Sequence, residues 1–197
     1  MILYDTEISR GSLLPLESKR VASLLLDHPG EIEWIKAIKI DNILQKDNPG
    51  TAIRQANLIR KRLETLDEEA WALISNREYE IANQLLLVAA IKQSKLLLDF
   101  MLNVYIVNQR RMNELISLAN WEDFLIECSH HDQTVKHWNE STKMKVFNSI
   151  VRILVETKYL SDKKMIKITP NSLHSAVKRY LLERNEDLII QSLERLK

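Results

Sequence analysis

The stretch that decides the fold is IANQLLLVAAIKQSKLLLDFMLNVYIV, residues 81–107. Apolar side chains would cover nearly every side of a helix built from it, which is typical of a helix at the centre of a fold. Its longest unbroken apolar run, residues 85–91, falls far short of the ~20 residues that a membrane span needs. Lys92, Lys95 and Asp99 would each cost roughly 2.5–3.5 kcal/mol at the centre of a bilayer. We therefore expect a buried helix or helix pair, not a membrane segment.

Outward from this stretch, the chain favours helices. Gly 3 and Pro 4 in 197 residues are few against the roughly 14 and 10 of average usage, and hairpin turns depend on these residues. A helix over residues 31–44, for example, would bury Ile32, Ile35, Ile38 and Ile43. Capping residues and 3.6-residue periodicity predict helices over residues 13–26, 31–44, 51–65, 67–76 and 78–107 (with a break near 93–94), a short one ending near 119, and others over 121–130, from about 142, from about 172 to 183, and 186–196.

One segment, MIKIT at residues 165–169, alternates like a strand. Tyr159 and Leu160 could form the other half of a short hairpin. We expect an all-α protein with a helical body over residues 1–130 and a smaller helical lobe over residues 131–197, or one continuous domain. In that lobe a helix followed by a basic hairpin resembles the end of a winged-helix module.

The composition excludes several classes of protein. A net charge of +1 excludes a simple polycation, and an opening interrupted by Asp5, Glu7 and Arg10 does not read as a secretory signal. The single cysteine, Cys128, cannot form an internal disulfide, which fits a reducing compartment. We therefore expect a soluble, cytoplasmic protein.

Residues suited to catalysis are scarce. Gly11, Gly30 and Gly50 lie too far apart for a phosphate-binding loop. Cys128 with His130, His131 and His137 offers metal ligands, but their spacing matches no standard finger, so loop histidines beside a buried thiol are the favoured interpretation. The interpretation of Cys128 and a histidine as a nucleophile with its base is weaker still. We expect no enzymatic activity, no metal and no cofactor.

Basic residues cluster in three acid-free places. A helix over residues 51–63 would place the first and third of its four cations on one face, and cations at a helix start would be explained by a phosphate partner. The alternative interpretation is that these cations form ordinary solvated faces and that acidic residues elsewhere balance their charge. The candidate nucleic-acid contacts are Arg54, Arg60, Lys61 and Arg62, then Lys143 and Lys145, then Lys163, Lys164, Lys167, Lys178 and Arg179.

Tryptophans offer a second route to nucleic acid, because bases stack on aromatic rings. Trp34, Trp71, Trp121 and Trp138 all fall in or just before predicted helices. Core anchoring, with the indole N–H reaching a partner, is the default interpretation.

The order of several segments resembles the BrxA family, small proteins encoded in BREX phage-defence clusters. The resemblance covers about residues 11–185 and lies in the order and spacing of the segments. They are GSLLPLESKRVASLLL (11–26), TAIRQANLIRKRLETLDEEAWALI (51–74), AAIKQSKLLLDFMLNVY (89–105), NWEDFL (120–125) and WNESTKMKVFNSIVRILVETKYL (138–160).

The resemblance implies an all-helical fold similar to NusB and nucleic-acid binding, with duplex DNA preferred to RNA, inside a multi-protein defence system. Other BREX subunits would be its partners, with no membrane and no small-molecule substrate. Two alternatives stay open: a protein–protein adaptor that scaffolds the defence complex, and an RNA-binding regulator of the NusB type. A DNA-contact role for Arg54, Arg60, Lys61 and Arg62 is our inference and is not fixed by the family pattern.

Overall fold

The computed structural model describes residues 3–76 and 78–194. The chain divides into two compact units. The N-terminal unit is Leu13–Ala89; the C-terminal unit joins Met1–Ser12 to Ala90–Lys197. The division falls within the central apolar stretch, and residues 130 and 131, where the expected body and lobe would meet, both lie in the C-terminal unit.

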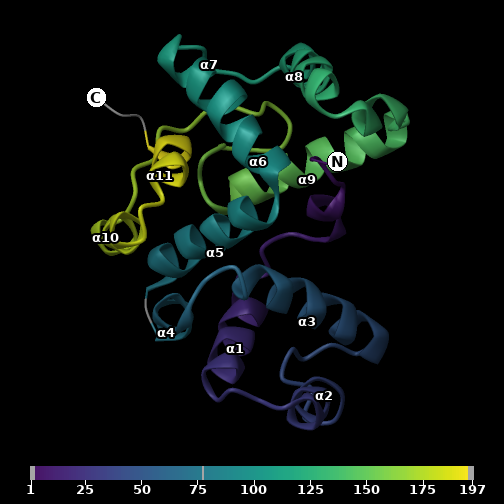
Figure 1. The fold of residues 1–197 in the computed structure, drawn as a ribbon, viewed down its shortest axis with the longest axis vertical. Coiled ribbons are helices and arrows are strands. Elements are labelled where there is room, and N and C mark those ends of the chain that lie inside the picture. The colour runs from purple at the N-terminus through teal and green to yellow at the C-terminus, as the bar shows by residue number, and fades with distance from the viewer. Residues whose placement is uncertain (1–2, 77, 195–197) are drawn as a thin grey trace. The chain divides into compact units, whose positions relative to one another are not determined.

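The fold is all-helical, as predicted (Figure 1). Predicted helix positions agree with most of the observed elements. The N-terminal unit holds α1 (Pro15–Leu26), α2 (Glu31–Lys39), α3 (Pro49–Leu63) and α4 (Glu68–Asn76). The next helix, α5 (Tyr79–Gln93), begins in this unit and ends in the C-terminal unit. The C-terminal unit holds the 3₁₀ turn η1 (Glu7–Arg10), α6 (Lys95–Phe100), the π-helical η2 (Met101–Tyr105), α7 (Ile106–Arg110), α8 (Leu118–His131), the 3₁₀ turn η3 (Gln133–His137), α9 (Glu140–Glu156), α10 (Ser175–Glu183) and α11 (Asp187–Leu193).

The central stretch behaves as expected. Every residue from Ile81 to Ile91 is buried, and the predicted break occurs at Ser94, whose hydroxyl accepts the N–H of Leu97 and caps α6. No helix in the described residues is long and apolar enough to cross a membrane. The π-helix that follows was not predicted, because no Gly or Pro marks it.

Three helices, α3, α8 and α9, begin two or three residues earlier than the sequence predicts. Thr51, Asn120 and Thr142 are each the third helical residue, and each donates its N–H to the true cap. Those caps are Asn48, Ser117 and Asn139. The error has a simple cause: polar residues that suit a cap also occur three positions after one. The helix predicted from about residue 172 begins later, since His174 caps α10 (Ser175–Glu183).

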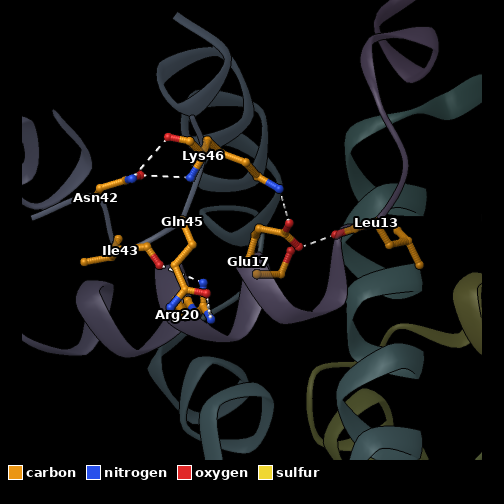
Figure 2. A network of polar contacts seen from close by, with 8 residues as sticks. Leu13, Glu17, Arg20, Asn42, Ile43, Gln45 and Lys46 are labelled. Atoms are coloured by element: carbon orange, nitrogen blue, oxygen red, sulfur yellow. Dashed lines mark hydrogen bonds and ion pairs between the residues drawn. The ribbon is translucent and has the colours of Figure 1, made fainter. Parts of the chain in front are cut away.

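In the N-terminal unit, α1 packs on α3 and α4, and α2 packs on α3. The loop after α2 is held against α1 (Figure 2). Arg20 donates to the carbonyl oxygen of Ile43 at 3.0 Å and to Oε1 of Gln45 at 2.8 Å. Glu17 pairs with Lys46. Burial alone would raise the pKa of Glu17, but the contact with Lys46 lowers it overall.

These contacts explain why α2 ends at Lys39 and does not reach Leu44 as predicted. The loop residues Asn42 and Gln45 adopt positive φ angles of 45° and 53°, which end a helix. The buried face of α2 consists of Trp34, Ala37 and Ile38. Ile32 and Ile35, predicted to be buried, are 84% and 40% exposed.

The C-terminal unit has an aromatic core. Trp121 stacks on Phe147 with ring centroids 5.2 Å apart and meets Phe100 edge-on at 6.0 Å. The turn η1 packs on α9, and the chain before η1 is anchored by Asp132, whose carboxylate accepts the N–H groups of Leu3 and Tyr4. Residues 3–12 therefore complete a core built mostly from the second half of the chain.

The predicted hairpin is not confirmed. Leu160 and Ile168 form one antiparallel bridge, and Leu115 and Lys167 form another, but the described residues contain no strand. The short helix predicted to end near residue 119 is wrong, because residues 112–117 are not helical. Residues 114–116 are instead the second partner of the MIKIT segment.

Candidate nucleic-acid interface

The first predicted cluster, on α3, is only partly at the surface. Arg62 is 3% exposed, so it cannot reach a phosphate and we remove it from the interface. The guanidinium of Arg60 lies 4.6 Å from the ring centroid of Trp34, and its Nε is 2.7 Å from Oε1 of Glu64. Arg60 thus joins α2 to α3 and has a structural role.

Arg54 and Lys61 remain exposed on α3. Their spacing of seven residues places them nearly in line along the helix. Arg54 donates to the hydroxyl of Thr51 at 3.2 Å. The α3 cluster is therefore reduced to two exposed cations on one face.

On α9, the two predicted contacts differ. Lys143 is half-buried and pairs with Glu140 at 2.7 Å. Glu140 sits in the first turn, where a carboxylate suits the helix dipole. Lys145 is exposed and forms no ion pair with the described residues. A phosphate is therefore not needed to explain Lys143.

Three of the predicted C-terminal cations lie beside acidic residues, two of which are distant in sequence. Lys167 lies 3.3 Å from Glu114, and Lys178 lies 2.5 Å from Glu194. Arg179 lies 3.8 Å from Glu183, one turn further along α10. Exposed pairs of this kind contribute about 0–1 kcal/mol, so a phosphate can compete with them.

Lys163 and Lys164 differ from the others. Both are exposed, and neither forms an ion pair within the part of the chain that the structure describes. They lie in a turn whose two sides are joined by backbone hydrogen bonds. Ser161 donates its N–H to the carbonyl oxygen of Lys167 at 2.9 Å, and Thr169 donates to Tyr159 at 2.9 Å.

A distant segment completes this surface. Ile116 donates its N–H to the carbonyl oxygen of Ile166 at 3.1 Å, and Ile168 donates to Glu114 at 2.8 Å. We call residues 110–116 and 162–168 together the loop pair. It carries Arg110, Arg111, Lys163, Lys164 and Lys167 against Glu114 and Asp162, a net charge of +3. Because the chain as a whole has a net charge of +1, the rest of it is acidic on balance.

Sequence reasoning missed Arg110 and Arg111. Both are exposed at the end of α7. As two cations at a helix C-terminus they suit the helix dipole, so nothing local pointed to a binding role. Only the pairing of residues 114–116 with 166–168 joins their segment to the lysines.

The structure also shows a groove of about 800 Å³ in the C-terminal unit, lined by the N-terminal segment, α6 to α8 and η2. The hydroxyl of Tyr4 donates to Oδ2 of Asp99 at 2.7 Å, and Asp99 pairs with Lys95 at 2.9 Å. These polar groups satisfy one another. Burial, followed by the bond to Asp99, raises the pKa of the Tyr4 hydroxyl above its usual range.

Cys128 lines the same groove but is 2% exposed. Burial raises the pKa of its thiol to about 12, although a hydrogen bond with Tyr4 opposes the shift. A thiolate is the reactive form of cysteine, so this thiol is poorly suited to act as a nucleophile. No group of three or more His, Cys, Asp or Glu side chains among the described residues is placed to hold a metal ion.

The tryptophans are mainly structural. Trp34 and Trp121 are buried at 4% and 1% exposure, and the half-buried Trp71 donates its indole N–H to the carbonyl oxygen of Leu63 at 2.7 Å. The indole N–H of Trp121 has no partner among the described residues. Base stacking on these three rings is therefore not supported.

Fold and surface together define an all-α protein with a cationic loop pair. Its structure is similar to the crystal structure of an uncharacterized protein from Magnetospirillum magneticum, with a TM-score of 0.88, 34% identity and 98% coverage of both chains. A BREX protein BrxA from Paramagnetospirillum magneticum is 36% identical over 97% of this chain and 96% of its own length. One from Escherichia coli O9:H4 is 35% identical over 76% of this chain and 70% of its own.

The family profile of BrxA matches residues 2–185. The chain belongs to the BrxA family, as the order of its segments predicted.

Proposed function

We propose that this protein is a non-catalytic, duplex-DNA-binding subunit of a BREX phage-defence system. The observation that carries the proposal is the loop pair, which gathers five cations and two acids in a chain of net charge +1. Its geometry is fixed by backbone hydrogen bonds between segments distant in sequence, so the cations are presented on an ordered surface.

Contacts of this kind recognise the phosphate backbone. Lys and Arg contacts to phosphate position a protein on nucleic acid without reading its sequence. Each neutralised phosphate releases counterions and contributes about −0.9 to the slope of log K against log salt for duplex DNA. With three to five of the loop-pair cations engaged, we expect a slope of about −3 to −4.5 and little dependence on base sequence.

Membership of the BrxA family supports a setting in phage defence and other BREX subunits as partners. We propose duplex DNA over RNA because the resemblance to this family implies that preference. The buried, single thiol of Cys128 suits a reducing compartment such as the cytoplasm.

A titration of labelled duplex DNA, single-stranded DNA and RNA of equal length, at low and moderate salt, tests this proposal. We expect the duplex to bind most tightly and to lose affinity steeply with salt. Tighter binding of RNA would favour the NusB-type regulator. No binding of any nucleic acid at low salt would refute the proposal.

A second candidate function is a protein–protein adaptor, which one observation favours. The outer face of α2 and the residue after it expose Ile32, Ile35 and Ile40 at 84%, 40% and 74%. Exposed apolar side chains that gather on one helix mark interaction surfaces. Pull-down of other BREX subunits is compared between the Ile32→Asp/Ile40→Asp variant and the unaltered protein. Because DNA affinity depends on a different surface, loss of these partners with unchanged DNA affinity would indicate the adaptor function.

A further inference from the structure

The tip of the loop pair, residues 162–166, is an ordered turn. The carboxylate Oδ1 of Asp162 accepts the N–H of Lys164 at 2.7 Å and the N–H of Met165 at 2.8 Å. These hydrogen bonds hold the pKa of Asp162 below its usual range. The Asp162 carboxylate is therefore engaged by the backbone of the tip itself.

Met165 is the apolar member of the tip and is 62% exposed. The two residues before it, Lys163 and Lys164, are exposed as well. A large apolar side chain between cations and water gains nothing from phosphate, since its free energy falls only when apolar surface covers it. A partner that covers Met165 and also contacts the two lysines would present apolar surface close to negative charge.

The backbone beside Met165 is strained. Ile166 has a φ of 50°, which is unfavourable for a β-branched residue. Its carbonyl oxygen is held by the N–H of Ile116. Strain that distant contacts maintain is often associated with function, and here it fixes the direction in which the chain leaves Met165.

We propose that the tip enters the minor groove of duplex DNA, where Met165 inserts as an apolar wedge against a base step while Lys163 and Lys164 contact the flanking phosphates. Base faces provide the apolar surface and phosphates the negative charge, within a few ångströms of each other. Proteins that bend DNA through the minor groove insert Met, Leu or Phe in this manner, next to Lys or Arg. The inference rests on the proposed function and adds the part of the duplex that the site recognises.

Duplexes that carry 2-aminopurine at one position test the wedge, because the fluorescence of this base rises when it is unstacked. We expect the unaltered protein to increase the fluorescence at an A·T-rich step. Met165→Ala should abolish most of the increase and weaken binding about tenfold, the loss expected for one buried Met side chain. Leu188→Ala is the matched control, since Leu188 is exposed to a similar extent, at 59%, but lies in α11, outside the loop pair.

The outcomes separate the inference from the proposed function. If the protein binds duplex DNA with a steep salt dependence but leaves the fluorescence unchanged, the wedge is refuted and phosphate binding stands. If Leu188→Ala and Met165→Ala reduce the signal equally, the wedge is also refuted. If the unaltered protein binds no duplex at all, both fail. Because Met165 is exposed, its substitution should leave folding intact, which circular dichroism checks.

Discussion

The backbone N–H of Ile116 donates to the carbonyl oxygen of Ile166 at 3.1 Å. Together with the bond from Ile168 to Glu114, it joins the segment after α7 to the turn that carries Lys163 and Lys164. It also holds Ile166 at positive φ. The cationic surface of this protein therefore depends on a contact between segments that are distant in sequence.

A disulfide can test this pairing. Leu115 and Lys167 face each other in an antiparallel bridge, and Cβ atoms in such pairs lie roughly 4.5–5.5 Å apart, a little wider than an ideal disulfide. We expect Leu115→Cys/Lys167→Cys to form a bond under mild oxidation, detected by mass and by loss of free thiols. Leu115→Cys/Arg179→Cys is the control and should stay reduced. Three free thiols in the unfolded first variant, Cys128 included, would contradict the pairing, whereas one free thiol is expected.

Arg62 and Lys61 are adjacent in sequence but have different roles. Arg62 is buried, and removal of a buried hydrogen-bonding group leaves its partners unsatisfied. We expect Arg62→Ala to lower the free energy of unfolding by roughly 1–3 kcal/mol or more, measured with urea. Lys61→Ala, at an exposed position, should change it by less than about 0.5 kcal/mol. Equal effects would show that Arg62 is not part of the core.

These two residues show how much of the candidate site can be predicted from the sequence. Acid-free spacing identifies α3 as basic, but it does not separate the buried Arg62 from the exposed Lys61, because helical position decides which side chain faces α1 and α2. It likewise cannot reveal that Glu114 and Glu194 neutralise Lys167 and Lys178. Arg110 and Arg111 were missed for the same reason. Such relationships arise from tertiary structure.

The fold was more predictable than the site. The central stretch is apolar on all sides, so burial of α5 and the break at Ser94 follow from local pattern. Where the prediction of α2 failed, Arg20 and Glu17 of α1 bind the loop after it, and a local pattern contains no information about those contacts. The π-helix at Met101–Tyr105 also lacks a local signal.

Asp132 predicts a pH dependence. Its carboxylate accepts hydrogen bonds from the N–H of Tyr4, the hydroxyl and N–H of Thr134 and the N–H of Leu3, which hold its pKa well below the usual range. A depressed folded-state pKa stabilises the fold above the unfolded-state value near 4, and this contribution is lost as the pH falls further.

We therefore expect Asp132→Asn to unfold at lower urea concentration than the unaltered protein at pH 7, with a smaller difference near pH 3. An amide must turn its NH₂ group toward N–H donors on one side, so it cannot replace both carboxylate oxygens. Asp123→Asn, at an exposed position of α8, is the control. A difference that is the same at both pH values would contradict the role of the charge.

Cys128 should be unreactive in the folded protein. Burial raises the pKa of its thiol to about 12, so at pH 8 almost none of it is thiolate. We expect a disulfide reagent such as DTNB to label it slowly in buffer and rapidly in guanidinium chloride. Rapid labelling of the folded protein would contradict the burial of Cys128 and would indicate a reactive cysteine.

The most direct test of the central claim is the salt dependence of duplex-DNA affinity for the unaltered protein and for Lys163→Glu/Lys164→Glu. Lys36→Glu/Lys39→Glu, which reverses two exposed charges on α2, is the matched control. We predict that the tip variant loses at least about tenfold in affinity and that its slope of log K against log salt becomes shallower by up to about 1.8. The control should retain the slope of the unaltered protein. Equal affinities and slopes for all three proteins would contradict the account.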